Sequence, residues 1–521
     1  MGRCDIISVM KDASVKQKKI VKTSQKMSLG MGDLGYSLVA NTYSSYILFF
    51  GNTVIGVSGT IIGLIIALGT VWDAVTDPIM GFVSDNTRNK TFGRRHLFAL
   101  IGMVGMAVVN ALLWAVPIDA NLGVKIAWLT VCIIALRTFT TLFQTPMSAF
   151  SLDVSPDYNE RSSIQIYKSV FNILGLLLPT LLIGLFQKDF VNPAGVFTDG
   201  RFNPDAYLNF GMVTSACCIL FGVIMFISTY SHVPRLREQA KNDYVVPAKG
   251  ALKKIFINFF GALKDKNFRA ITIGYMVSMV SASILIAVGF NVFTFTFKTT
   301  KLQMYTIMAG LFIMTIAGQP LWMWMSKKYD KKKALITGQC ISLIGCILLF
   351  VMFLARDFFI GLLQKNGLNV IFMMPPLMVA GLGTGVLYSL PVALIGDTVV
   401  IEKARTGEDK TATYTGFLTL GNKTGQAISS AVLGVALDLI GFQEGSSIQT
   451  PEVESGLGWL MCIGVTLAVG CGILIFSRCK MTREEVQEAL EKVNQMSVAK
   501  EDVEVSTVEI ASEIVEVEET K

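Results

Sequence analysis

Two acidic residues lie inside a long apolar stretch, where carboxylates are rare. Asp73 and Asp77 are four residues apart in VSGTIIGLIIALGTVWDAVTDPIMGFV, residues 57–83. On an α-helix this spacing places both side chains on one face, with Thr76 beside them. Two carboxylates this close do not both stay ionised cheaply, so one holds a proton or a cation lies between them. Because carboxylate and hydroxyl oxygens are hard ligands, the pattern predicts a site for Na⁺ or a proton.

A structural alternative stays open for this pair. In this alternative, one aspartate only caps a helix break at Pro78 or pairs with a lysine, and it binds no cation. A carboxylate in hydrocarbon costs several kcal/mol, and intramembrane acids are therefore functional candidates by default.

Three further apolar stretches carry charged or polar side chains. Arg137, Thr141 and Gln144 share one helical face, since they are spaced i, i+4, i+7. Three roles stay open for Arg137: the counter-charge to the aspartates, a donor to an anionic substrate, or part of a structural ion pair. Lys423 in YTGFLTLGNKTGQAISSAVLG is a donor to a polar substrate, a charge that moves during transport, or a fixed ion pair. Asp33 in GMGDLGY lies nearer the cytoplasmic end, where capping or gating is expected.

The elements that position these residues are membrane helices. The chain has 521 residues, of which 52% are hydrophobic and 16% charged, whereas soluble domains carry about 25% charged residues. Its apolar runs have the ~20 residues that a helix needs to cross a bilayer, and they lack the alternation of barrel strands. An all-α membrane protein with about twelve transmembrane helices is predicted. The expected spans are 28–51, 57–83, 97–117, 123–149, 167–187, 209–231, 270–296, 304–325, 335–355, 370–393, 413–440 and 457–477.

Basic residues gather in the loops at one end of these spans. This asymmetry predicts that both termini are cytoplasmic in a cell-membrane protein, and it accounts for the net charge of +7 without nucleic acid. No nucleophile–base pair or metal cluster is visible, so an enzyme is not expected. The predicted organisation is a cytoplasmic tail (1–27), a six-helix half (28–231), a cytoplasmic linker with an amphipathic helix (232–269), a second six-helix half (270–479) and an acidic cytoplasmic tail (480–521).

The two predicted halves have similar sequence patterns. Pro78 and Pro320 both precede a basic cytoplasmic turn, and Asp77 corresponds to Gln319 in this comparison. The arrangement resembles the major facilitator fold, in which two six-helix halves enclose a site near the bilayer midplane. The chemistry of the carboxylates therefore belongs to the N-terminal half.

The charged motifs resemble those of one family, the glycoside–pentoside–hexuronide cation symporters. The family's D-x-x-x-D-P-x-x-G pattern and basic turn run from Asp73 to Arg95, and Lys423 falls on its helix-eleven lysine. SLDVSPDYNERSSIQIY is similar to the family's Asp-Tyr-x-Glu-Arg loop, and IGDTVVIEKARTGEDKTATYTGF is similar to its segment before helix eleven. The resemblance covers nearly the whole membrane part.

The resemblance implies a secondary active symporter that imports a sugar, glycoside or uronide with Na⁺ or H⁺ by alternating access. It needs no cofactor, and a monomer in contact with membrane lipid is expected. The implied cation-binding residues are Asp73, Thr76, Asp77, Thr141 and Gln144, with Asp73 and Asp77 as the metal ligands for Na⁺. The implied gating residues are Asp33, Arg94, Arg95, Asp157, Glu160, Arg161 and Asp397. The substrate-binding candidates are Ser37, Arg137, Gln144, Ser148, Lys168 and Lys423.

The substrate site departs from that of the melibiose permease, a member of this family. Ser37 and Gln144 align with its sugar-binding carboxylates, Ser148 with its stacking tryptophan, and Ser169, next to Lys168, with its arginine. Unpaired sugar hydroxyls would be costly, so a different substrate is expected. An amphiphilic substrate is one alternative, because vertebrate lysophospholipid symporters share these signatures. A transport-inactive membrane sensor is another.

Overall fold

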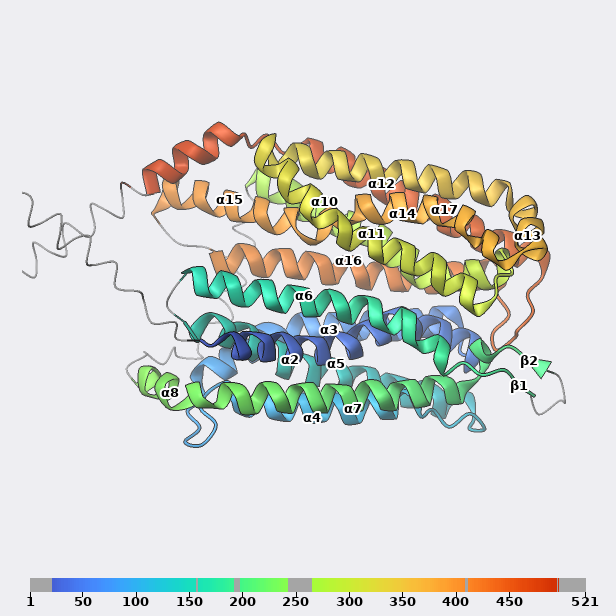
Figure 1. The fold of residues 1–521 in the computed structure, drawn as a ribbon, viewed down its shortest axis with the longest axis horizontal. Helices are drawn as coiled ribbons and strands as arrows, with labels where there is room; N and C mark the ends of the chain where they lie inside the picture. Colours follow the sequence, from blue (N-terminus) through green and yellow to red (C-terminus); the bar gives the residue numbers. More distant parts are fainter. Residues whose placement is uncertain are drawn as a thin grey trace, which may run out of the picture. The chain divides into compact units, whose positions relative to one another are not determined.

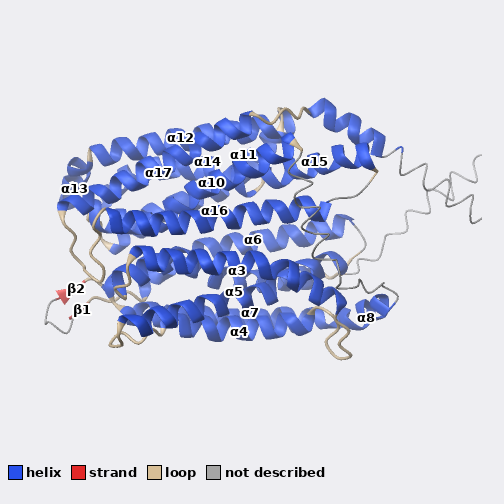
Figure 2. Ribbon diagram, turned by 180° about the vertical axis from the view of Figure 1, so that it is seen from behind, coloured by secondary structure: helices blue, strands red, loops and turns tan. Residues whose placement is uncertain are grey.

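The structure is a computed structural model of the 521-residue chain. It describes residues 21–155, 158–191, 197–241, 265–407, 411–493 and 495. These residues form helices almost throughout, and the strands among them make one short ribbon (Figure 2). The predicted amphipathic helix of the linker, Asp157 and most of both tails lie outside the described residues.

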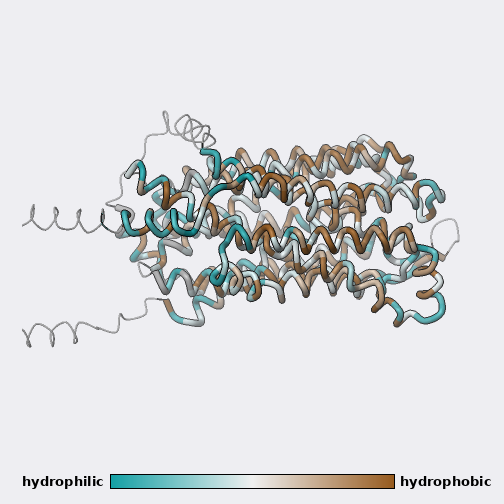
Figure 3. Tube along the Cα trace, turned by 90° about the horizontal axis from the view of Figure 1, so that it is seen from above, coloured by the Kyte–Doolittle hydropathy of each residue, from teal (hydrophilic) through white to brown (hydrophobic). Residues whose placement is uncertain are grey.

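Ten of the described helical segments are long and apolar enough to cross a membrane. Figure 3 shows apolar residues along the middle of the helices and hydrophilic residues at their ends. Two further helices, α2 (Thr23–Phe49) and α16 (Thr411–Leu439), reach the same length and carry several polar side chains. With them the described chain has about twelve spans, so the predicted all-α membrane fold is confirmed.

The chain divides into two compact units. Unit 1 lies within residues 1–47 and 75–245, and unit 2 within residues 48–74 and 246–521. The division falls inside α2 and inside α3 (Gly59–Asn86). Segment 48–74, which joins these two helices, therefore belongs to unit 2 although the chain on both sides of it belongs to unit 1.

Unit 1 is organised around α4, which packs against α5 and α7 (Figure 1). Gly102 lets α4 approach α5 closely, because a Cβ there would lie 2.5 Å from the backbone nitrogen of Phe143. The buried Asn110 side chain of α4 donates to the carbonyl of Gly211 and the hydroxyl of Ser215 on α7. The elements are α2 up to Ile47, α3 from Val75, α4 (His96–Trp114), α5 (Leu122–Asp153), α6 (Tyr158–Leu182), η2 (Ile183–Leu185), β1 (Phe190–Val191), β2 (Phe197–Thr198), η3 (Gly200–Phe202), α7 (Pro204–Thr229), η4 (Tyr230–His232) and α8 (Val233–Lys241).

In unit 2, α10 packs against α16 and α17, while α14 packs against α11 and α12 (Figure 1). Trp322 is completely buried in the core of this unit, and its indole N–H donates to the carbonyl of Leu382 at 2.9 Å. The elements are η1 (Phe50–Val54), α3 up to Ala74, α10 (Lys266–Asn291), η5 (Val292–Thr296), α11 (Lys301–Lys328), α12 (Lys331–Leu354), α13 (Arg356–Lys365), η6 (Gly367–Met373), α14 (Met374–Thr384), η7 (Gly385–Tyr388), α15 (Leu390–Thr406), α16 and α17 (Pro451–Ser477).

Helix α3, which carries both aspartates, is continuous through Pro78. It begins at Gly59 and ends only at Asn86, so the helix does not break at the proline. Pro320 is likewise inside α11. The aspartates therefore lie on an uninterrupted helical surface, and a break at Pro78 is not the reason for their presence.

Candidate functional site

The Asp73 carboxylate lies in unit 2 beside the lysine of α16. Its Oδ2 atom is 2.8 Å from Nζ of Lys423, and the Asp73 residue is only 6% exposed. A buried ion pair of this geometry recovers part of the desolvation energy of both charges, while removal of one partner leaves the other charge uncompensated. Two residues that are far apart in the sequence are thereby held together within one unit.

The Asp77 carboxylate lies one helical turn further along α3, in unit 1. Its Oδ1 atom accepts a hydrogen bond of 2.9 Å from Oγ1 of Thr141, which is buried on α5. Gln144 is on the same helix, and its buried Oε1 atom has no hydrogen-bond partner among the described residues. Unit 1 thus supplies carboxylate, hydroxyl and amide oxygens, which are the donor types that a hard cation requires.

Arg137, two turns from Gln144 on α5, contacts an aromatic ring. Its Cζ atom is 4.8 Å from the ring centroid of Tyr43 on α2, a cation–π geometry. The neighbouring Tyr36 ring stacks on Phe143 with the centroids 6.3 Å apart. Tyr43 of α2 therefore packs against the polar face of α5 that the sequence predicted, through Arg137.

Asp33 and Lys168 form a second buried ion pair within unit 1. The Asp33 Oδ1 atom on α2 is 3.6 Å from Lys168 Nζ on α6, and both side chains are less than 10% exposed. The ammonium group also donates to the Ser151 hydroxyl of α5 at 3.2 Å. The sequence assigned these two charges to different roles, and the structure brings them together between three helices.

Two asparagines that the sequence analysis missed surround Ser37. The Ser37 hydroxyl accepts a hydrogen bond of 2.6 Å from Asn172 of α6, and Asn41 donates to the carbonyls of Ser37 and Gly175. Ser37 itself is 1% exposed. Ser148, on α5, is partly buried. The presence of amide side chains inside apolar stretches was the signal that could have identified both asparagines.

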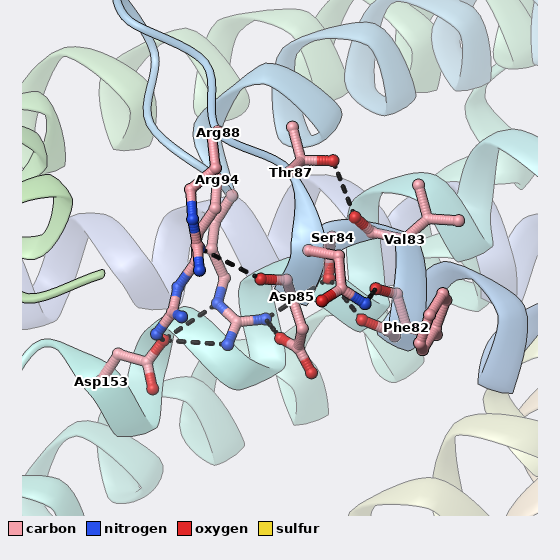
Figure 4. A network of polar contacts seen from close by, with 11 residues as sticks. Phe82, Val83, Ser84, Asp85, Thr87, Arg88, Arg94 and Asp153 are labelled. Carbon is pink, nitrogen blue, oxygen red and sulfur yellow. Dashed lines mark hydrogen bonds and ion pairs between the residues drawn. The ribbon is translucent and has the colours of Figure 1, made fainter. Parts of the chain in front are cut away.

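The basic turn after α3 is fixed by two acids at the same end of unit 1 (Figure 4). Arg94 and Arg95 both contact Oδ2 of Asp153, the last residue of α5, at 3.1 Å and 2.9 Å. Arg95 also pairs with Asp85 at 2.8 Å and donates to the Ser84 hydroxyl. The sequence identified the arginines, whereas Asp85 and Asp153 were overlooked because nothing local marks them as partners.

The start of α6 is held by a separate set of contacts. The buried Glu160 carboxylate accepts hydrogen bonds from the backbone of Val21 and the hydroxyl of Ser155, and it lies 3.7 Å from Lys26. Arg161 donates to the carbonyl of Ser155 at 2.6 Å. These contacts tie the beginning of α2 to the loop between α5 and α6 within unit 1.

Asp397, the remaining gating candidate, lies on α15 in unit 2. It pairs with Lys331 at the first residue of α12, with a separation of 2.5 Å. Among the described residues, no group of three or more His, Cys, Asp or Glu side chains is arranged to hold a metal ion.

Known proteins with similar sequences are transporters. The family model of the MFS/sugar transport protein matches residues 28–483. The isoprimeverose transporter of Lactiplantibacillus pentosus is 22% identical over 88% of this chain and 89% of its own. Sodium-dependent lysophosphatidylcholine symporter 1 of Xenopus tropicalis is 21% identical over 95% of this chain and 94% of its own.

Solved structures show the same fold. A bacterial homolog of the human lysosomal transporter Spinster, in an inward-facing and unoccupied conformation, has a TM-score of 0.61 and 13% identity over 91% of this chain and 98% of its own. The nucleoside transporter NupG has a TM-score of 0.59 and 13% identity over 88% of this chain and 100% of its own. The predicted resemblance to cation symporters is therefore confirmed. The chain belongs to the MFS/sugar transport protein family, and it is a multi-pass membrane transporter of the symporter type rather than an enzyme.

Proposed function

We propose that the protein is a cation-coupled symporter that imports a sugar, glycoside or uronide across the cell membrane, with both termini in the cytoplasm. The observation that carries this proposal is the pairing of Asp73 with Lys423, one helical turn from the contact between Asp77 and Thr141. Acids placed at such cost in a membrane helix are expected to take part in transport.

The proposed coupling cation binds to oxygens on α3 and α5. Asp73 and Asp77 supply charge, and Thr76, Thr141 and Gln144 supply neutral oxygens. Two relatives named sodium-dependent symporters match nearly the whole chain, which supports Na⁺ over a proton. A site with two carboxylates and neutral donors suits Na⁺ because these are hard oxygen ligands.

Lys423 is proposed to neutralise Asp73 in the absence of the cation. An unpaired buried carboxylate is strongly unfavourable, so the ammonium group keeps the empty carrier neutral. When the cation binds to Asp73, it displaces the lysine, and the ammonium group becomes a donor to the substrate. Cation and substrate then favour the same state of the protein, and this shared preference is the coupling.

The substrate is proposed to be a carbohydrate. The candidate hydrogen-bonding residues are Lys423 in unit 2 and Arg137, Gln144 and Ser148 on α5 in unit 1. Ser37 and Lys168 already have polar partners, and they are proposed to shape the site through Asn172 and Asp33. The family description and the relative named isoprimeverose transporter support a sugar.

A lysolipid-like amphiphile is the second candidate substrate. Relatives named sodium-dependent lysophosphatidylcholine symporters match 82–96% of this chain, and the isoprimeverose transporter matches 88%. The two candidates differ in their chemistry, since only a lysolipid carries a long apolar tail. A competition experiment with both classes therefore separates them.

The test is uptake into proteoliposomes that contain the purified protein. Panels of glycosides, uronides and lysolipids are compared under an inward Na⁺ gradient, an inward proton gradient and no gradient. Asp73→Asn and Asp77→Asn are expected to lose accumulation above equilibrium, whereas Asp119→Asn, which changes an exposed loop acid, keeps it. Full gradient-driven accumulation in both α3 variants would refute the proposal.

A further inference from the structure

Segment 48–74 is held by helices that are distant in the sequence. It comprises the last residues of α2, η1 and the first part of α3, and it belongs to unit 2. On both sides the chain continues, within α2 and α3, into unit 1. The contacts between this segment and the rest of unit 2 are therefore those that must break if α2 and α3 are to move as whole helices.

The N-terminus of α3 is capped by a carboxylate from α16. The Asp438 carboxylate accepts hydrogen bonds from the backbone N–H groups of Gly59 at 2.8 Å and Thr60 at 2.9 Å, and from the Ser58 hydroxyl at 3.0 Å. The first N–H groups of a helix have no partner within the helix, and its positive end favours an anion. Asp438 therefore supplies charge-assisted hydrogen bonds to a helix that begins 379 positions earlier.

Three glycines bring the two helix backbones into direct contact at this point. A Cβ at Gly59 would lie 2.7 Å from the carbonyl oxygen of Gly434, and a Cβ at Gly63 would lie 3.0 Å from its Cα. A Cβ at Gly434 would overlap the carbonyl of Gly59. Small residues at both surfaces are what allow membrane helices to pack this closely.

A second polar layer joins η1 to α10 and to the loop after α16. The Asn52 carbonyl accepts a hydrogen bond of 3.0 Å from Gly445, and the Thr53 hydroxyl donates to Oδ1 of Asn291 at 3.4 Å. Asn52 and Asn291 are completely buried, yet Asn52 Oδ1 and Asn291 Nδ2 have no hydrogen-bond partner among the described residues. Each such atom costs about 1–3 kcal/mol while the contact is closed.

This chemistry suits a contact that opens to water. After separation, water would be available as a hydrogen-bond partner for the first backbone N–H groups of α3, for the Asp438 carboxylate and for both asparagines. An apolar contact of the same size would instead expose hydrocarbon at about 25 cal/mol per Å². The closed arrangement is therefore stable without being so favourable that it is permanent.

We propose that Asp438 is a gating residue, and that its bonds to the start of α3 form a latch that closes the path between α3 and α16 at the end of α3 opposite its basic turn. The proposal rests on the proposed alternating-access symport. The latch holds in the state described here, and it releases when segment 48–74 leaves α16. Asp438 lies outside the charged motifs that the sequence analysis identified.

The first test crosslinks the latch. Ser58→Cys and Asp438→Cys are combined in a variant whose nine native cysteines are replaced by serine, and the pair is bridged with a short bifunctional thiol reagent. Uptake is expected to fall at least tenfold after bridging by a reagent that a reductant cleaves, and to return after reduction. A matched control bridges Asn110→Cys with Ser215→Cys between α4 and α7, which remain packed in unit 1. Full uptake in the bridged protein would overturn the latch and leave the symport proposal intact.

A second test does not depend on transport. Ser430→Cys introduces a thiol at a residue whose backbone carbonyl contacts Gly63, where α3 and α16 meet. Asp438→Ala is expected to raise its rate of labelling by a membrane-impermeant reagent about tenfold, because loss of the latch favours the open state. Asp119→Ala serves as the control. An unchanged labelling rate in Asp438→Ala would overturn the proposal even if the variant transports poorly.

Discussion

Replacement of Lys423 by methionine tests whether the lysine and the coupling cation compete for Asp73. At the observed 2.8 Å separation, Coulomb's law gives an attraction of about 6 kcal/mol at an effective dielectric of ~20, and about 1.5 kcal/mol in water. The cation that displaces Lys423 must overcome whatever part of this attraction remains after desolvation of both groups. Because the lysine side chain is 18% exposed, we take the remaining penalty to be that of a hydrogen bond to a charged group, about 1.5–3 kcal/mol.

Lys423→Met therefore removes a competitor and leaves Asp73 without its observed ammonium partner. The half-saturating cation concentration is expected to fall about tenfold to a hundredfold, since each 1.4 kcal/mol corresponds to a factor of ten. Coupled uptake is expected to fall at the same time, because the ammonium group is no longer available to the substrate. Lys423→Arg retains the positive charge, so its cation affinity should stay at the wild-type value, below that of Lys423→Met.

The assay is the thermal unfolding midpoint of the purified protein as a function of NaCl concentration at fixed pH. Choline chloride at matched ionic strength is the control. A second series varies the pH to test proton coupling. Cation binding stabilises the folded state in proportion to its saturation. Lys298→Met is the control, because this lysine is 56% exposed and its pairing with Glu454 is expected to contribute little. A weaker or unchanged cation affinity in Lys423→Met would refute the competition.

Three further results are expected. Asp73→Asn and Asp77→Asn should abolish gradient-driven accumulation and leave substrate exchange partly intact, measured as counterflow; retained accumulation in both would contradict the cation site. Thr141→Ala should weaken cation binding about tenfold in the same thermal titration, because a hydrogen bond to a charged group contributes about 1.5–3 kcal/mol, whereas Thr141→Ser should retain the affinity. Arg95→Ala should lower the thermal unfolding midpoint, because it leaves the half-buried Asp153 without one of its two arginines; an unchanged midpoint would show that Arg94 is sufficient.

The membrane helices, and the faces of those helices that carry polar side chains, could be predicted from the sequence alone. Apolar runs of bilayer length predict helices without reference to tertiary structure, and i, i+4 spacing places Asp73 and Asp77 on one helical face. Thr141, whose hydroxyl contacts Asp77, shares one face of α5 with Arg137 and Gln144 by the same spacing. These predictions hold because a membrane helix satisfies its own backbone, so that local sequence decides its structure.

Partners between distant helices could not be predicted in this way. The sequence showed that Lys423 needs a partner, but the choice of Asp73 over Asp77 depends on how α16 packs against α3. Asp438 resembles any acid at the end of a helix until its distance to Gly59 is known. Asn172 was overlooked because a single polar residue in a helix has no periodic signal, and its contact with Ser37 depends on the packing of two helices.

The central claim is that the two acids of α3 hold the coupling cation. It is tested most directly without any substrate, by calorimetric titration of the purified protein with NaCl in a weakly buffered solution while the pH is recorded. For the wild-type protein we predict saturable cation binding, seen as heat or as a released proton, and for Asp73→Asn and Asp77→Asn we predict its loss. Unchanged heat, proton release and affinity in both variants would contradict the account.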